Sequence, residues 1–145
     1  MEFYGKVFQD LTGSQVYEIL KSRSEIFMLE QGIRCLDMDD VDYKSRHCFF
    51  TEGDRVVAYL RAFYLSEDRN TVKIGRVLTL NHGRGVGTEL MKKSIDDISA
   101  NMKCKKLHVD AQKQAVGFYK KMGFSITSEE FLEEGIPHVS MEMEL

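Results

Sequence analysis

The pattern of apolar and polar positions in this chain switches several times between the two-residue period of strands and the longer period of helices. Residues 2–8 are rich in aromatic and β-branched side chains, which predicts a first strand. Residues 11–32 open with helix-capping residue types, continue with apolar positions at helical spacing and end at Gly32, which predicts a long first helix. The acidic stretch 36–42 that follows is irregular, and its pattern indicates no more than a short helical turn.

The middle of the chain contains three strand patterns and one helix pattern. Residues 47–65 form two of the strands, joined at Gly53-Asp54, which is typical of a β-hairpin. Residues 71–80 form the third strand. After a glycine-rich stretch, residues 86–100 place apolar side chains on one face of a helix. The glycine-rich stretch is therefore expected between a strand and a helix.

The last third of the chain continues this alternation of strands and helices. In residues 105–111 apolar and polar side chains alternate, which predicts a strand with one buried face. Residues 112–123 predict a short helix that stops at Gly123. Residues 124–128 and 138–145 predict two closing strands on either side of an acidic loop. The order βαβββαβαββ predicts an α/β fold in which helices flank a mixed central sheet.

Length, composition and charge limit the classes of function. The 145 residues are expected to form one domain, residues 1–145, and the balance of 43% hydrophobic and 30% charged residues is typical of a globular protein. The net charge of −3, with both signs interspersed, provides no basic surface for nucleic acid. No apolar run reaches the roughly 18 residues of a membrane span, and the N-terminus carries charges where a secretory signal needs apolar residues. We therefore expect neither a nucleic-acid nor a membrane partner.

The three cysteines, Cys35, Cys48 and Cys104, are widely spaced and form neither a CxxC pair nor a metal-ligand pattern. They are expected to be reduced thiols in a cytoplasmic protein, and no metal site is predicted.

The stretch NHGRGVGTELM, residues 81–91, suggests a site for an anion. Backbone N–H groups at a helix N-terminus bind anions, and glycines allow a close approach because no Cβ intervenes. A Walker loop is excluded because no lysine follows the glycines. A dinucleotide fingerprint is excluded because Thr88 or Leu90 stands where its last glycine is needed. A plain structural turn remains the alternative.

Two motifs together resemble the GNAT superfamily of acyl-CoA-dependent N-acetyltransferases. The family's loop has the form [R/Q]xxGxG, and the positions here are His82, Gly85 and Gly87, with histidine in place of the usual basic or amide residue. The second motif combines a small and an aliphatic residue, an aromatic residue or leucine before tyrosine, and a glycine–phenylalanine pair. The matching residues are Ala115, Val116, Phe118, Tyr119, Gly123 and Phe124.

Other segments resemble the ElaA-type branch of that superfamily and extend the likeness over nearly the whole chain. The branch carries R-x-x-x-F-x-x-E-Q, which is found here from Arg23 to Gln31, and an E/D-G-I-P-H segment, which is found at residues 134–138. The resemblance implies a GNAT fold and transfer of an acetyl group from acetyl-CoA to a primary amine, on a small molecule or on a protein. It leaves a homodimer open.

The resemblance also implies which residues bind the coenzyme A part of acetyl-CoA. Backbone amides of residues 84–88 would hold the pyrophosphate, with Arg84 adding positive charge. The strand end from Leu78 to Leu80 would pair with the pantetheine arm, and an N–H near Leu78 would stabilise the oxyanion. Gln112 would touch the same arm or, alternatively, cap the next helix. The implied residues are Leu78, Thr79, Leu80, Arg84, Gly85, Val86, Gly87, Thr88, Gln112 and Tyr119.

Tyr119 matches the family position whose hydroxyl lies near the thioester sulfur, so the resemblance implies that it is the general acid. A phenol with a pKa of about 10 and a thiol with a pKa of about 8.5 are close enough for useful proton donation. The alternative is a ring that packs in the core with its hydroxyl at the surface.

The base that deprotonates the amine has several candidates. The loop before the last strand is implied to cover the acceptor side, where His138 could relay a proton. His108 and Glu30 are further candidates, and each also has a structural interpretation. Phe27, Glu30 and His138 are the predicted acceptor-side residues, whereas His47 is expected to be structural.

Charged residues give less specific signals. The acidic residues of 37–42 and 129–134 could attract a cationic amine or form solvated faces. Arg23 and Arg76 interrupt apolar patterns, so each needs an anionic partner, either a local carboxylate or an acidic group on the substrate. Two other functions stay open: a non-catalytic acyl-CoA-binding module of the same fold, and a nucleotide-binding protein, which the missing lysine and fingerprint disfavour.

Overall fold

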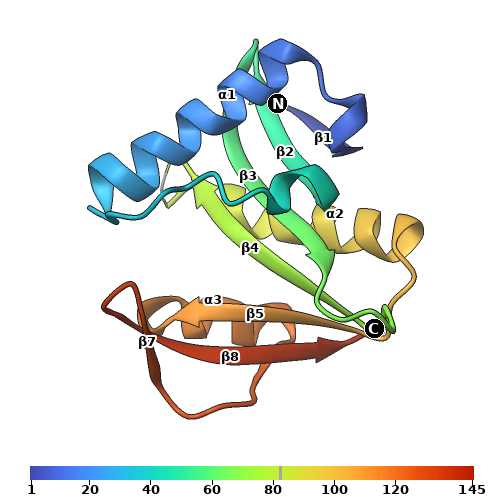
Figure 1. The fold of residues 1–145 in the computed structure, drawn as a ribbon, viewed down its shortest axis with the longest axis vertical. Helices are drawn as coiled ribbons and strands as arrows, with labels where there is room; N and C mark the ends of the chain where they lie inside the picture. Colours follow the sequence, from blue (N-terminus) through green and yellow to red (C-terminus); the bar gives the residue numbers. More distant parts are fainter. Residues whose placement is uncertain (82) are drawn as a thin grey trace.

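A mixed sheet of eight strands forms the frame of the computed structural model, which describes residues 1–81 and 83–145 (Figure 1). The strand order is β1-β2-β3-β4-β5-β8-β6, and β7 pairs with β8. The strands are β1 (Glu2–Val7), β2 (Arg46–Glu52), β3 (Arg55–Tyr64), β4 (Thr71–Thr79), β5 (Lys106–Gln112), β6 (Ser125–Ile126), β7 (Phe131–Glu133) and β8 (Ile136–Glu144). The helices are α1 (Gly13–Arg23), α2 (Val86–Asn101) and α3 (Val116–Met122), with short helical segments η1 (Phe8–Asp10), η2 (Ser24–Glu30), η3 (Val41–Lys44) and η4 (Lys113–Ala115).

The predicted element order is confirmed, with one strand added. The loop that we expected between the last two strands contains β7, which pairs with β8 as a tight hairpin. Its two turn residues, Glu134 and Gly135, both have positive φ, at 50° and 73°. Two residues of positive φ are the requirement of the hairpin turn whose twist matches the strands. Sequence analysis missed β7 because it is three residues long and lies within an acidic stretch.

The predicted long helix is divided into two parts. Thr12 and Gln15 form a capping box at the start of α1. After Arg23 the chain continues as the π-helix η2, closed by a hydrogen bond from the Gln31 amide to the Ile26 carbonyl. π-turns widen a helix locally and are frequent at functional sites. The hydrophobic period of the sequence indicates a helix here but not its change of pitch.

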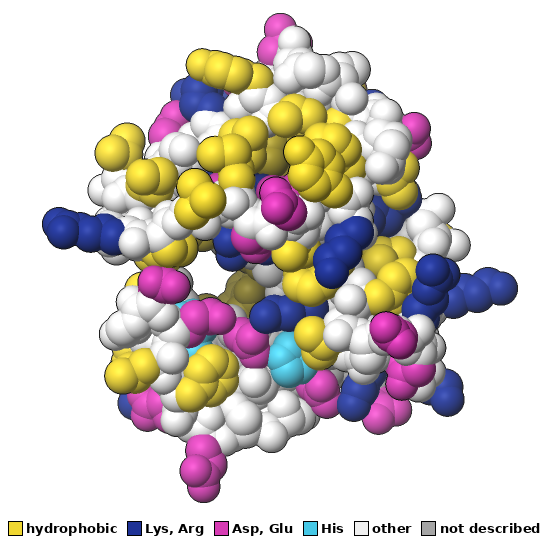
Figure 2. Space-filling model, in the orientation of Figure 1, with side chains coloured by type: hydrophobic (Ala, Val, Ile, Leu, Met, Phe, Trp, Pro, Cys, Tyr) yellow, Lys and Arg dark blue, Asp and Glu magenta, His cyan; other side chains and the backbone are white. Residues whose placement is uncertain are grey.

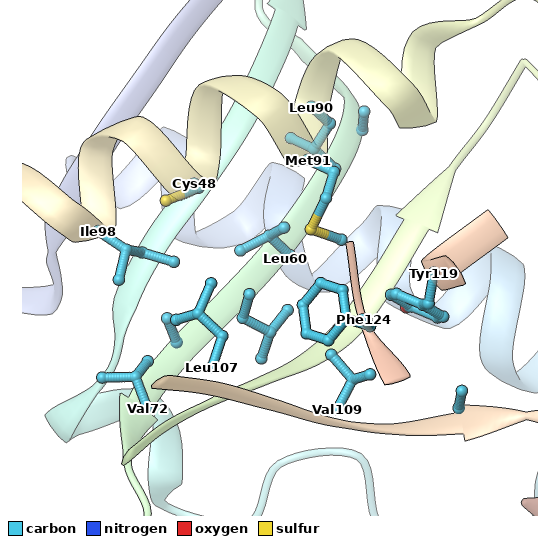
Figure 3. Packing of buried hydrophobic residues seen from close by; sticks show 14 of the residues in the cluster. Cys48, Leu60, Val72, Leu90, Met91, Ile98, Leu107, Val109, Tyr119 and Phe124 are labelled. Atoms are coloured by element: carbon cyan, nitrogen blue, oxygen red, sulfur yellow. The ribbon is translucent and has the colours of Figure 1, made fainter. Parts of the chain in front are cut away.

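The two faces of the sheet bury separate apolar clusters. Neighbouring residues in β2 point to opposite faces, so Phe50 packs toward α2 and α3 whereas Phe49 packs toward α1 and η2. Figure 3 shows the larger cluster, in which Leu90 and Met91 of α2 lie over Leu60 of β3. The helices thus cover both faces, as the sequence predicted.

β4 and β5 run parallel, but they are paired only over the four residues from Thr71 to Ile74 on β4. Beyond that point β4 shifts its register against β3, and Arg76 adopts a left-handed conformation with φ of 53°. These are the marks of a β-bulge, which bends a strand. β5 continues against β8 instead. The two strands therefore separate, and the sheet is open between them.

Candidate active site

A cavity of about 770 Å³ lies where β4 and β5 separate, and Figure 2 shows a hollow between the upper and lower parts of the molecule. One end is bounded by residues 83–88, the end of β4 and α3, and we call it the glycine-loop end. The other is bounded by η2, residues 31–37 and the β7–β8 turn, and we call it the hairpin end. This volume is in the range of small-molecule sites.

Most of the residues predicted for the site meet in this cavity. Those that line it are Phe27, Leu78, Thr79, Gly85, Gly87, Thr88, Gln112, Tyr119 and His138. Those outside its lining are Glu30, Leu80, Arg84 and Val86. His82, the first position of the loop motif, lies outside the described residues.

Gly83 and Gly85 adopt left-handed conformations, with φ of 79° and 74°. Gly85 is the N-cap of α2 and has no side chain to cap it, so the first N–H groups of the helix lack an acceptor within the helix. A Cβ on Gly85 would meet nothing within 4 Å, so the demand for glycine is conformational. Open N–H groups at the start of a helix are able to bind an anion, and the anion site at this loop stays a prediction.

The end of β4 directs alternate backbone groups toward β3 and toward the cavity. The Leu80 amide donates to the Val57 carbonyl on β3 at 2.8 Å. By alternation Leu78 also faces β3, whereas the backbone groups of Val77 and Thr79 face the cavity. The Leu80 amide is therefore already paired within the sheet, and the pairing of the strand end from Leu78 to Leu80 with a ligand stays a prediction. The bulge in β4 sets this register, and the alternation of side chains in the sequence does not reveal it.

Tyr119 lies on α3, lines the cavity and is 7% exposed. Its ring packs edge-on against Phe118 and Phe124, with centroids 5.2 and 5.6 Å away. Burial raises the pKa of Tyr119 to about 12. Among the described residues its hydroxyl has no hydrogen-bond partner. The ring therefore belongs to the core while the residue also borders the cavity.

The glycine–phenylalanine pair after α3 fixes the helix that carries Tyr119. Gly123 has φ of 110°, and the Phe124 amide donates to the Tyr119 carbonyl at 3.0 Å. This is a helix C-terminus that requires glycine. A Cβ on Gly123 would also come within 2.9 Å of the Met143 sulfur. The spacing of the second motif thus has a structural cause.

His138 is 6% exposed at the start of β8, directly opposite Gln112 of β5. Its Nδ1 donates to the Ile136 carbonyl at 2.7 Å, and its Nε2 lies 3.3 Å from a carboxylate oxygen of Glu133. The ring stacks on Phe131 of β7, with an interplanar angle of 24°. The hairpin therefore fixes the imidazole, and a carboxylate lies at the nitrogen that faces away from the backbone.

Gln112 links the two walls of the cavity. Its Nε2 donates to Oε1 of Gln31 at 3.2 Å, and its Oε1 accepts from Gln114 at 2.6 Å. These amides connect the end of η2 to the end of β5. Of the neighbouring residues Glu30 and Gln31 in the sequence motif, Gln31 lines the cavity and Glu30 does not.

Three arginines and three aspartates form a network behind the hairpin end, which sequence analysis did not assemble. Its members are Arg23, Arg61, Arg76, Asp37, Asp39 and Asp42. The fully buried Arg23 bonds Asp37 at 2.9 Å and Asp42 at 2.8 Å, and Arg76 at the bulge bonds Asp37 at 2.9 Å. The partners that the two unusual arginines required are thus local carboxylates. The sequence shows these aspartates as one acidic stretch, but their arginine partners come from α1, β3 and β4.

The arginines stabilise the charged form of these carboxylates. Arg61 holds the pKa of Asp39 well below its usual range. Burial would raise the pKa of Asp42, but Arg23 and Arg61 keep it lowered. The predicted interpretations of residues 37–42, attraction of an amine or a solvated face, are therefore wrong for Asp37 and Asp42, which are largely buried and paired with arginines, whereas Asp39 is paired but stays exposed.

His47 and His108, the other two histidines of the described residues, are held by structural partners. His47 lies between the Tyr59 hydroxyl at 2.7 Å and the Asp42 carbonyl at 2.9 Å, as expected for a structural residue. His108 lies between Glu142 at 2.9 Å and Asp110 at 2.8 Å, on the sheet face below the cavity. Both nitrogens of His108 are occupied, which disfavours it as a base.

Asp110 lines the cavity where its two ends meet. Its carboxylate lies 2.9 Å from Lys73 and accepts a hydrogen bond from Ser140. Burial would raise the pKa of Asp110, but the hydrogen bonds from Lys73, Ser140 and His108 lower it to about 2. The lysine and the aspartate therefore neutralise each other.

Within residues 1–81 and 83–145, no helix is long and apolar enough to cross a membrane. The same residues contain no group of three or more histidine, cysteine or acidic side chains placed to hold a metal ion.

A family model described as "Acetyltransferase (GNAT) domain" matches residues 28–145. The chain is 34% identical over 140 residues to Protein ElaA of Escherichia coli (strain K12), which covers 94% of this chain and 92% of that protein. The crystal structure of Escherichia coli ElaA superimposes with a TM-score of 0.91 at 31% identity, covering 99% of both chains.

Two further solved structures share the fold. An acyl-CoA N-acyltransferase from Pseudomonas aeruginosa has a TM-score of 0.89 at 27% identity and covers 99% of both chains. A GNAT family acetyltransferase from Elizabethkingia anophelis, solved with acetyl-CoA bound, has a TM-score of 0.68 at 18% identity and covers 99% of this chain and 97% of that one.

Proposed function

This chain belongs to the GNAT acetyltransferase family, and we propose that it transfers an acetyl group from acetyl-CoA to a primary amine by direct attack in a ternary complex. The observation that carries the proposal is one continuous cavity. It joins an open helix N-terminus at the glycine loop to the buried Tyr119 and then to His138.

The glycine-loop end fits the coenzyme A part of acetyl-CoA. Left-handed Gly83 and Gly85 leave the start of α2 open to a phosphate group, and the backbone of Val77 is directed toward the cavity. We assign the diphosphate to the amides of residues 84–88 and the extended arm to the cavity edge of β4, with Gln112 opposite. Arg84 is exposed, and it contributes charge near the loop.

Acetyl-CoA supplies a thioester as the activated acyl donor. We assign Tyr119 to the stabilisation of the sulfur that leaves this thioester. The raised pKa of about 12 keeps its hydroxyl protonated at any working pH. The phenol is a weaker acid than the thiol that it would protonate, and the shift widens the gap between their pKa values. Tyr119 is therefore expected to hydrogen-bond the charge that develops on sulfur and to complete the proton transfer as the bond breaks.

His138 is assigned to the proton that the amine must lose. Its Nδ1 is bonded to the Ile136 carbonyl, so only Nε2 can exchange a proton with the cavity. Glu133 at 3.3 Å can take up or orient that proton. Because Glu133 is half exposed, it can move aside when an amine approaches. Phe27 forms part of the opposite wall. Glu30 lies outside the lining, and we assign it no step.

The alternative function is a non-catalytic acyl-CoA-binding module of the same fold. The test is a panel of primary amines with acetyl-CoA, with thiol release as the readout and calorimetric binding of CoA as the control. Release that depends on both the amine and Tyr119 is expected. If CoA binds but no amine causes thiol release, the protein is the non-catalytic binding module and the enzyme proposal fails.

A further inference from the structure

The hairpin end of the cavity has two walls of opposite character. One wall is mainly apolar: η2 and the following segment contribute Ile26, Phe27, Met28, Ile33 and Leu36, together with Gln31, Cys35 and the ion-paired Asp37. The other wall is the turn of the β7–β8 hairpin, which contributes Glu133 and Glu134. In Figure 1 the end of η2 and this hairpin project to the same side of the molecule, above and below the opening in the sheet.

Every cationic side chain that lines the described cavity already has a carboxylate partner. Arg61 is paired with Asp39 at 2.7 Å, and Lys73 is paired with Asp110 at 2.9 Å. Arg76 is paired with Asp37 at 2.9 Å. A carboxylate on a ligand would have to displace one of these partners or lose its water without compensation, and both cost free energy.

The hairpin carboxylates are in the opposite situation. In the described residues Glu134 has no ion-pair partner, and Glu133 has only the 3.3 Å contact with His138. Negative charge is therefore left over at this end of the cavity, on the wall that faces apolar side chains. Because opposite charges attract, this residual negative charge favours a ligand that carries a positive charge.

We infer that the acceptor is a small primary amine with an apolar body and no carboxylate, that is, an arylalkylamine or alkylamine. This inference rests on the proposed function, because it describes the second substrate of that reaction. The ammonium group lies toward Glu133 and Glu134, and the apolar body lies on Phe27, Met28 and Leu36. Amino acids are rejected for lack of a free cation, and polyamines for lack of apolar contact. The body is small because the cavity also holds the thioester end of the donor.

Binding to the CoA-saturated protein tests the charge preference without requiring turnover. The ligands are phenethylamine, phenylalanine, 2-phenylethanol and spermidine, measured by calorimetry. Phenylalanine adds a carboxylate, 2-phenylethanol removes the cation and spermidine removes the aryl body. Phenethylamine is expected to bind at least about 10-fold more tightly than each of the others. Equal or tighter binding of any one of them, or no binding of phenethylamine, overturns the inference.

Two variants with matched controls locate the walls. Glu134→Gln is expected to weaken phenethylamine binding about 3- to 10-fold, whereas Glu129→Gln, before β7 and outside the cavity lining, leaves it unchanged. Leu36→Ser is expected to weaken phenethylamine more than methylamine. Its control is Leu132→Ser, because both leucines are at least 70% exposed but only Leu36 lines the cavity. Equal effects of a variant and its control overturn the assignment of that wall.

Thiol release separates this inference from the proposed function. If phenethylamine binds with the expected preference but no amine releases thiol, the enzyme proposal fails and the recognition site stands. If the protein acetylates amino acids or spermidine more efficiently than phenethylamine, the enzyme proposal stands and the inference about the acceptor fails.

Discussion

The two ends of the cavity are built from different parts of the polypeptide. The glycine-loop end is mainly backbone: left-handed glycines, an open helix start and the cavity edge of β4. The hairpin end is mainly side chains, and its shape depends on ion pairs between residues up to 39 positions apart in the sequence. A site formed by backbone groups depends little on which side chains surround it, so related proteins with different sequences can bind the same ligand there. A site formed by side chains changes its ligand preference when those side chains are substituted. The first end is therefore expected to be generic and the second specific.

The largest effect that tests this comparison is expected from Arg23→Met. The substitution leaves Asp37 and Asp42 partly buried without their main cation, which is expected to lower the free energy of unfolding by about 3–5 kcal/mol. Urea unfolding measures the loss. Adding Asp42→Asn should recover part of it. CoA binding to the folded fraction should change little, because the network lies behind the hairpin end. A loss below about 1 kcal/mol would mean that the network does not stabilise the fold.

Tyr119→Phe is expected to have the next largest effect. It keeps the ring packed against Phe118 and Phe124 but removes the proton. The turnover number should fall roughly 10- to 1000-fold while CoA affinity stays within about 2-fold. Tyr17→Phe is the matched control, because Tyr17 is 67% exposed on α1. An unchanged turnover number with chemistry rate-limiting would make Tyr119 a packing residue.

His138→Asn changes the hairpin end alone. Asparagine can keep a hydrogen bond to the Ile136 carbonyl but cannot relay a proton. We expect turnover to fall about 10- to 100-fold and the acidic limb of the kcat–pH profile to disappear, with CoA binding intact. If the profile keeps its shape and only the melting temperature falls, His138 holds the hairpin and has no part in proton transfer.

Gly85→Val changes the glycine-loop end alone. Valine is strained at φ of 74°, and its side chain would stand where a phosphate must approach. CoA binding is expected to weaken about 10-fold, measured by calorimetry. Binding of phenethylamine, measured without CoA for both proteins, should not change. Gly53→Val, at φ of 59° in a distant turn, controls for backbone strain. If a folded Gly85→Val protein binds CoA with unchanged affinity, the assignment of the phosphate to this loop is wrong.

The last prediction concerns Asp110, where the two ends meet. Its pKa is about 2 in the folded protein and about 3.9 in an unfolded chain. A lowered pKa contributes stability above the unfolded value, and this contribution is lost as the pH falls from about 4 to 2. We expect the loss to be roughly 1–3 kcal/mol, measured by urea unfolding across this range. Asp110→Asn should flatten the curve there. An equally steep curve in the variant would assign the acid sensitivity to other carboxylates.

The fold and the glycine-loop end could be predicted from sequence because their signals are local. Gly85 and Gly123 each answer a conformational demand at their own position, and alternation along the strands assigns the buried faces. Even at that end, the sequence did not reveal that β4 shifts its register at the left-handed Arg76, or that the Leu80 amide pairs with β3. The hairpin end was predicted less completely. Asp37 was interpreted as part of a solvated or amine-attracting acidic stretch, because nothing near it in the sequence indicates that it pairs with Arg23 and Arg76.

The bulge in β4 also bears on aggregation. An unpaired strand edge at the rim of a sheet can recruit a strand from another protein molecule. Here the edge of β4 beyond Ile74, which β5 does not pair, borders the cavity that α3 and the β7–β8 hairpin also line. A thin, flexible arm that carries amides can reach this edge, whereas a foreign strand would have to enter between those two elements. The backbone groups at this edge are thus accessible from the cavity but shielded from the strands of other protein molecules.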